Sequence, residues 1–186
     1  MYTMRRIALL LLILTAAFQA CKKDSSSGPD PAKAIDAFLV RNNEIAGWTY
    51  SGSGWVANNI SELTTYIDGM ADTYQRHGFV EAARQDYQGS VNSKSAQLRL
   101  TVYNQATVAN ASALYADSAL GFVGAIDWTG GAGDASHYAR YSGLSQVLSF
   151  YRNGYYVSLE MNADTEESLN VLKQFALNVD GKLKNG

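Results

Sequence analysis

Hydrophobic residues recur along this chain with two spacings, and each spacing predicts a different kind of element. Between Asn59 and Gly78 the apolar residues follow a helical period and fall on one face. Asn59 and Glu62 are spaced as in a capping box, and Gly78 is a typical helix end. We therefore predict one helix between them, with an apolar face made of Ile60, Leu63, Ile67, Met70, Ala71 and Tyr74.

Two later segments have the same helical spacing. Residues 107–120 are rich in alanine, and small side chains allow a helix to lie close to a sheet. The last helix is expected to begin at Asp164, with Glu167 three residues further on. Its apolar stripe consists of Leu169, Leu172, Ala176, Val179 and Leu183.

Strands are predicted where apolar and polar residues alternate or where aromatic residues cluster. Asn153-Gly154 is a strong signal for a two-residue hairpin, and another turn is expected at residues 89–94. Tight turns between consecutive strands favour an antiparallel sheet. We predict one α+β domain over residues 33–186, with about three helices packed mainly on one face of the sheet. The expected strands cover residues 47–57, 79–87, 97–103, 136–142, 144–152 and 155–161.

The N-terminal pattern is that of a secretory signal peptide over residues 1–20. Two arginines precede an apolar run from Ile7 to Phe18, and Cys21, the only cysteine, follows small Ala20. This order resembles a lipobox, in which Cys21 carries lipid, although Phe18 stands where leucine is usual. One alternative is a membrane-spanning helix, but the run of about 12 residues is shorter than the roughly 20 required. The other is an ordinary signal peptide with a chance cysteine.

Residues 21–32 are polar, contain both prolines of the chain, and predict a flexible tether. Lys22-Lys23-Asp24 is either a signal that sends lipoproteins to the outer face of the outer membrane or a generic linker. We therefore expect a protein of the bacterial cell envelope that is held at the membrane, with the outer membrane favoured, by its N-terminal lipid.

Charge and cysteine content exclude some classes of function. Without Arg5 and Arg6 the chain has 13 basic residues against 17 acidic ones, and no basic cluster outside the tether. Nucleic-acid binding is therefore not expected. Because there is no second cysteine, core packing rather than disulfide bonds must stabilise the fold.

Residues suited to catalysis are few. His77 has a structural explanation at a helix C-terminus, where an imidazolium interacts favourably with the helix dipole. His137 follows Ser136, and Asp134 or Asp127 could complete a Ser/His/Asp set, but neighbours in a strand point to opposite faces. The sequence has no spacing typical of metal ligands or of a cofactor motif, so neither is expected. A non-catalytic protein is therefore favoured over an enzyme.

Aromatic residues around a glycine-rich loop are the predicted ligand- or partner-binding residues. Trp128 precedes Gly130–Gly133, and Tyr138 and Tyr141 follow the loop. Tyrosine and tryptophan are common anchors of interfaces, and loops often carry sites, although Trp128 also suits a core.

Gly69, expected in mid-helix, marks either a surface position or close backbone contact, or a bare patch that admits a ligand or partner.

Several short motifs carry a resemblance to known proteins: Ala46-Gly47-Trp48, Leu63-x-x-Tyr66-Ile67-x-Gly69-x-Ala71, Tyr74, Gly78-Phe79, Asn110-Ala111 and Leu114-Tyr115. Together they resemble an uncharacterised family of bacterial secreted proteins and lipoproteins. Met70 stands where that family often has a second glycine. The resemblance implies a fold and an envelope location, and it implies no reaction.

Three functions remain open from the sequence. The favoured one is a non-catalytic envelope module that binds a protein, peptide or glycan through an aromatic surface. The second is a small hydrolase of envelope polymers that uses acidic residues and the Ser136/His137 region. The third is a carrier of lipid or of another small apolar ligand, held in a cavity between helices and a curved sheet.

Replacing Cys21 by serine tests the predicted lipid anchor. The Cys21→Ser protein has no thiol to acylate and is expected to stay soluble or unprocessed, whereas the wild type enters the membrane fraction. Metabolic labelling with a palmitate analogue measures the difference. A wild-type protein that takes up no label would show that the lipobox interpretation is wrong.

Overall fold

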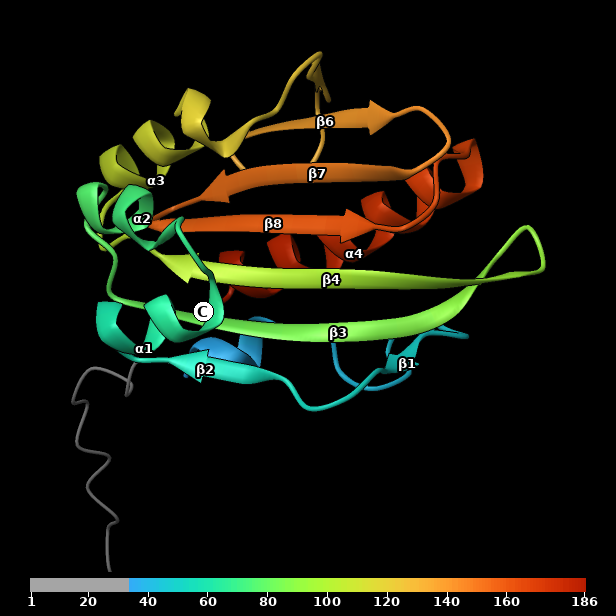
Figure 1. Ribbon diagram of the computed structural model, residues 1–186, viewed down its shortest axis with the longest axis horizontal. Coiled ribbons are helices and arrows are strands. Elements are labelled where there is room, and N and C mark those ends of the chain that lie inside the picture. Colours follow the sequence, from blue (N-terminus) through green and yellow to red (C-terminus); the bar gives the residue numbers. More distant parts are fainter. Residues whose placement is uncertain (1–33) are drawn as a thin grey trace, which may run out of the picture. The chain divides into compact units, whose positions relative to one another are not determined.

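A computed structural model describes residues 34–186, which belong to one compact unit; the predicted signal peptide, lipidation site and tether lie outside them. The strands are β1 Thr49–Tyr50, β2 Trp55–Ala57, β3 Glu81–Val91, β4 Lys94–Asn104, β5 Ile126–Asp127, β6 Ala135–Tyr141, β7 Ser145–Arg152 and β8 Tyr155–Met161. They form one antiparallel sheet in the order β1-β3-β4-β8-β7-β6-β5, and β2 also pairs with β3 (Figure 1). The predicted α+β class and antiparallel sheet are confirmed.

Tight turns connect the long strands. β3 and β4 pair along eleven residues each and turn at Asn92 and Ser93, both of which have positive φ. This turn is narrower than the predicted one at residues 89–94, because the pairing continues to Val91 and Lys94. Asn153-Gly154 joins β7 to β8 as predicted, with Asn153 at φ 54°.

Helix α4 (Glu166–Lys184) covers one face of the sheet, which we call the α4 face. It contacts β7 and β8, and the short 3-10 helix η1 (Ile35–Phe38), which the sequence did not predict, packs beside it on β3 and β4. The helix is capped by Thr165, whose hydroxyl accepts a hydrogen bond from the Ser168 N–H at 3.1 Å, one residue later than predicted. Every residue of the predicted apolar stripe is buried: Leu169, Leu172, Ala176, Val179 and Leu183.

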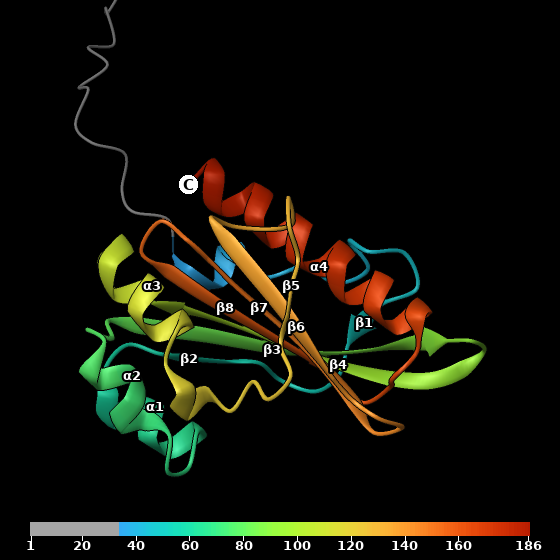
Figure 2. The same ribbon diagram turned by 90° about the horizontal axis from the view of Figure 1, so that it is seen from above.

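The opposite face, which we call the open face, carries helices at one end only. They are α1 (Ile60–Tyr66), α2 (Ala71–Arg76) and α3 (Val108–Tyr115), followed by the 3-10 turn η2 (Ser118–Leu120). Figure 2 shows α4 on one side of the sheet and α1 and α2 on the other. Three of the four α-helices in residues 34–186 therefore pack on the open face, as the predicted fold has it, and the longest, α4, covers the other face. The division arises because this end of the open face is also apolar, with a second core of Ala57, Leu63, Tyr74, Ala82, Tyr103, Leu114 and Tyr156.

Two short helices stand where the sequence predicts one. The predicted cap at Asn59 is confirmed, because its side chain accepts a hydrogen bond from the Glu62 N–H. However, α1 ends at Tyr66, and Gly69 adopts φ 71° before α2 begins. This left-handed conformation favours glycine and interrupts the helix, so the prediction that Gly69 lies in mid-helix is wrong. α3 also ends earlier than predicted, at Tyr115.

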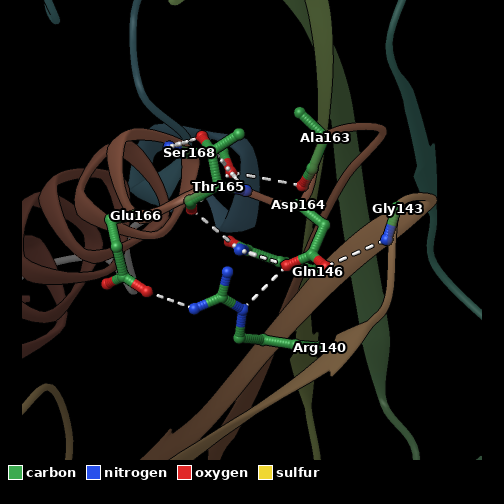
Figure 3. A network of polar contacts seen from close by, with 8 residues as sticks. All are labelled: Arg140, Gly143, Gln146, Ala163, Asp164, Thr165, Glu166 and Ser168. Carbon is green, nitrogen blue, oxygen red and sulfur yellow. Dashed lines mark hydrogen bonds and ion pairs between the residues drawn. The ribbon is translucent and has the colours of Figure 1, made fainter.

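A polar network holds the N-terminus of α4 on the hairpin between β6 and β7 (Figure 3). Asp164 accepts hydrogen bonds from Arg140 Nε at 2.7 Å, Gln146 Nε2 at 3.0 Å and the Gly143 N–H at 3.0 Å. Hydrogen bonds from Gln146 and Arg140 lower the pKa of Asp164 to about 2. Arg140 also pairs with Glu166 in the first turn of the helix.

A second ion pair holds the C-terminal half of α4. Arg152 of β7 donates from Nε to Asp180 at 2.7 Å, and the side chain of Asp180 is only 2% exposed. Lys184 reaches the other carboxylate oxygen of Asp180 at 2.7 Å. Removing one partner of a buried ion pair lowers the stability of the fold, because the other charge is left unpaired. The Arg152–Asp180 contact therefore helps to hold α4 on the sheet.

Leu172 and Leu177 of α4 offer a matched test of the fold, because Leu172 is fully buried and Leu177 is 50% exposed. We expect Leu172→Ala to lower the free energy of unfolding by about 2–5 kcal/mol, since it leaves a cavity in the core. Leu177→Ala is expected to change it by less than about 0.5 kcal/mol. Urea unfolding measures both values. Equal losses in the two variants would contradict the orientation of α4.

Candidate ligand-binding site

Two of the residues predicted to bind a ligand lie together on the α4 face. Trp128 and Tyr138 are half-buried against the main core. The Nζ atom of Lys173 lies 5.2 Å from the centroid of each ring, so both rings already make cation–π contacts with α4. Tyr141 is not part of this group. The alternation of β6 directs it to the open face, where its hydroxyl donates to the carbonyl of Gly121 at 3.2 Å.

The two remaining predicted site residues, Gly69 and Cys21, lie away from this group or outside the described residues. Gly69 lies in the turn between α1 and α2, and a Cβ atom added there would have no neighbouring atom within 4 Å. The close-contact interpretation of Gly69 is therefore wrong, and its positive φ accounts for the glycine. Cys21 lies outside the described residues, so its lipidation stays a prediction.

A cleft of about 300 Å³ lies on the open face beside the short helices. It is bounded by side chains from the strands below it and from the helices at its side. The wall consists of Trp55 of β2, Ile67 and Met70 of the turn after α1, and Tyr74 of α2. The floor consists of Arg84 of β3, Arg99, Thr101 and Tyr103 of β4, and Ser158 and Glu160 of β8.

Stacked aromatic rings give the cleft a fixed apolar side. Trp55 is parallel to Tyr66, with ring centroids 4.5 Å apart and an angle of 1° between the planes. Tyr74 stacks on Tyr103 at 4.2 Å. Burial raises the pKa values of Tyr74 and Tyr103, so their hydroxyls stay protonated at neutral pH and can donate as well as accept hydrogen bonds.

Four charged side chains form an alternating row across β3, β4 and β8. Arg84 donates from Nε and Nη2 to the carboxylate of Asp86 at 2.9 and 2.7 Å. Arg99 lies directly opposite Asp86 and Glu160 in the sheet and contacts them at 3.7 and 3.2 Å. The side chains of Arg99 and Glu160 are 50% and 48% exposed, so each keeps free hydrogen-bonding positions. The row is electrically balanced and open to solvent.

A second hollow of about 120 Å³ lies further along the sheet and shares Arg99 and Glu160 with the cleft. The second hollow also contains Asp86 and the amide side chains Gln97 and Asn162. Gln97 and Tyr103 are six residues apart in β4, which corresponds to about 20 Å of strand. We call the two neighbouring hollows together the groove; they border the same strand along this distance.

Ser136 and His137 do not meet, as the strand alternation predicted. Ser136 donates from Oγ to the carbonyl of Trp128 at 3.2 Å, whereas His137 Nε2 lies 2.7 Å from Ser149 Oγ. Ser149 is fully buried, and the ring of Tyr115 stacks on His137 with centroids 4.3 Å apart. The Ser149 side chain is thus buried, whereas His137 borders a hollow of about 410 Å³ that Tyr115 and Phe122 also line.

His77 has the structural position that the sequence predicted, at the C-terminus of α2. Its Nε2 atom lies 2.8 Å from Asp117, which precedes η2. Contacts with His77 and with the Ala119 N–H lower the pKa of Asp117 to about 2.

Within residues 34–186, no three His, Cys, Asp or Glu side chains are placed to hold a metal ion. In the same residues, no helix has both the length and the apolar character needed to cross a membrane.

The residues of the cleft were missed because their signal is weak in a linear sequence. Arg99, Thr101 and Tyr103 alternate with the apolar residues of β4, as in any strand with one polar face. Only the pairing of β4 with both β3 and β8 brings them beside Arg84 and Glu160. Trp55 was predicted to lie in a strand, but its stacking on Tyr66 depends on the turn that ends α1.

Comparison with family descriptions, curated proteins and solved structures finds no match for this chain, so the resemblance to uncharacterised secreted proteins stays a prediction.

His137 provides a pH test of the site's surroundings. Burial lowers the pKa of His137 below its ordinary value of 6.5, so the unfolded chain takes up a proton at a higher pH than the folded protein does. Stability is therefore complete above about pH 6.5 and falls as the pH decreases toward the folded-state pKa. Urea unfolding between about pH 7 and 5 should give a flatter profile for His137→Gln than for the wild type.

Asp117 and Asp164 contribute little between pH 7 and 5, because their stabilising effect is lost only as the pH falls from their unfolded-state pKa of about 3.9 toward the folded-state value of about 2. Identical pH profiles for the wild type and His137→Gln would show that His137 is not a buried neutral ring.

Proposed function

We propose that this protein is a lipid-anchored protein of the bacterial cell envelope, favoured to lie in the outer membrane, whose domain binds a polar molecule without catalysis. The anchor rests on the N-terminal sequence up to Cys21. The binding function rests on one observation, the convergence of aromatic rings, hydroxyls and balanced charges in the cleft of the open face. Ligand sites combine apolar walls with a few placed polar groups in this way.

The alternative of an envelope hydrolase has less support. A Ser/His pair for nucleophilic catalysis needs an accessible serine, and Ser149, which contacts His137, is fully buried. The acids of the groove, Asp86 and Glu160, are each engaged by an arginine. A carrier of apolar ligands also has less support, because both hollows of the groove are lined by charged side chains.

The loop from Trp128 to Tyr141 is the second location for a binding surface, as the sequence proposed. It is less favoured than the cleft because Lys173 of α4 already engages the rings of Trp128 and Tyr138. Tyr141, on the other face of β6, cannot join them in one platform.

Substitutions in the two locations distinguish them. The probes are arrays of oligosaccharides and of peptides, applied to the full mature protein in a detergent without a sugar head group. Ser158→Ala removes one partly exposed hydroxyl of the cleft, and Arg99→Gln removes a half-exposed charge. We expect each to weaken binding about tenfold, the loss of one or two hydrogen bonds.

Leu177→Ala, on the exposed side of α4, is the matched control and should bind as the wild type does. Binding that is unchanged in both cleft variants but lost in Trp128→Phe or Tyr138→Phe would move the site to the loop. A hydrolytic activity that His137→Ala abolishes without unfolding would replace the binding function with an enzymatic one.

A further inference from the structure

We propose that the ligand of the groove is an uncharged oligosaccharide, a step that rests on the binding function proposed above. Charge balance, the arrangement of aromatic rings and hydroxyls, and the position of the groove on the sheet each favour this class of molecule over an anionic polymer or a peptide.

Charge balance favours an uncharged ligand. Arg84 is held by two hydrogen bonds to Asp86, and Arg99 lies between Asp86 and Glu160. Two guanidinium and two carboxylate groups carry no net charge, so the row offers no net attraction to an anionic or a cationic ligand. The hydroxyls of a neutral sugar can donate to carboxylate oxygens and accept from guanidinium N–H groups without breaking any of these pairs.

The cleft matches the two surfaces of a sugar ring. A pyranose has a flat face of C–H groups and an edge of hydroxyls. The ring of Trp55, with Met70 beside it, offers an apolar surface for the first. The hydroxyl of Ser158, the cross-strand neighbour of buried Thr101, and the arginine and glutamate groups offer partners for the second.

The position of the groove disfavours an extended peptide. Peptides that bind sheets add a strand to a free edge, where main-chain N–H and C=O groups lack partners. The groove instead lies on β3, β4 and β8, and β4 is paired on both sides. Its available hydrogen-bonding groups therefore belong to side chains, which suit a ligand rich in hydroxyls.

The length of the groove indicates several sugar units. From Tyr103 to Gln97 it follows about 20 Å of β4, and the far hollow ends at the amide groups of Gln97 and Asn162. Amide side chains both donate and accept hydrogen bonds, as hydroxyl groups do. We expect the chain of the oligosaccharide to lie along β4.

The test compares neutral and acidic oligosaccharides, with peptides as a third class, on the full mature protein in the same detergent. The expected result is binding of neutral oligosaccharides only, with longer chains bound more tightly than single sugars. The dissociation constant should change less than about twofold between about 0.02 and 0.5 M NaCl, because no net charge is neutralised.

Two tryptophan variants locate the ligand. Neutral oligosaccharide should change the tryptophan fluorescence of the wild type and of Trp128→Phe, but not that of Trp55→Phe. Trp55→Phe retains an aromatic ring against Tyr66 and is expected to remain folded, with affinity reduced about tenfold. Circular dichroism confirms the fold of each variant.

Other outcomes separate the inference from the proposed function. Exclusive binding of acidic oligosaccharides or of peptides, weakened by Arg99→Gln, overturns the inference and leaves the cleft as the binding site. Binding of a neutral oligosaccharide that is unaffected by Trp55→Phe, Arg99→Gln and Ser158→Ala overturns both. Absence of binding by all three classes at millimolar concentration also overturns both.

Discussion

The burial of α4 against one face of the sheet is the interaction on which the other features depend. The helix is 19 residues long, and its apolar stripe shares one core with β3, β4, β7 and β8. Each fully buried large aliphatic side chain contributes about 1.5–3 kcal/mol, so this stripe is a major source of stability. Ion pairs from Arg140 and Arg152 hold both parts of the helix in place. The α4 stripe thus buries much of the apolar surface on that face of the sheet.

The open face can remain partly uncovered because the main core is complete without it. The three α-helices on that side have only 7, 6 and 8 residues, and they cover the end of the sheet where Tyr103 and Tyr156 lie. Polar side chains occupy the next positions along the same strands. The positive φ of Gly69 ends the helical run and leaves Ile67 and Met70 at the boundary between these regions. The groove is the step between the covered and uncovered parts of one sheet face.

Elements with strong local signals can be predicted from the sequence. Features that depend on contacts between distant residues cannot. The stripe of α4, the cap at Asn59 and the Asn153-Gly154 hairpin are local, and all three are confirmed. The helix break at Gly69 was missed because the residues on both sides keep the helical period. Division of the helices between two faces depends on which strands pair, which local pattern does not reveal. The site has the same limit, because Trp55, Arg84 and Glu160 come from three separate strands.

In the proposed binding mode, the ligand lies in the groove of the open face, opposite α4. Titration of ¹⁵N-labelled protein with the oligosaccharide that binds most tightly tests it directly, because each amide and each indole N–H reports its own surroundings. We expect shifts for the Trp55 indole and for the amides of Arg99, Thr101 and Ser158, with the Trp128 indole unchanged. Shifts confined to Trp128, the Gly130–Gly133 loop and α4, with a silent groove, would contradict it.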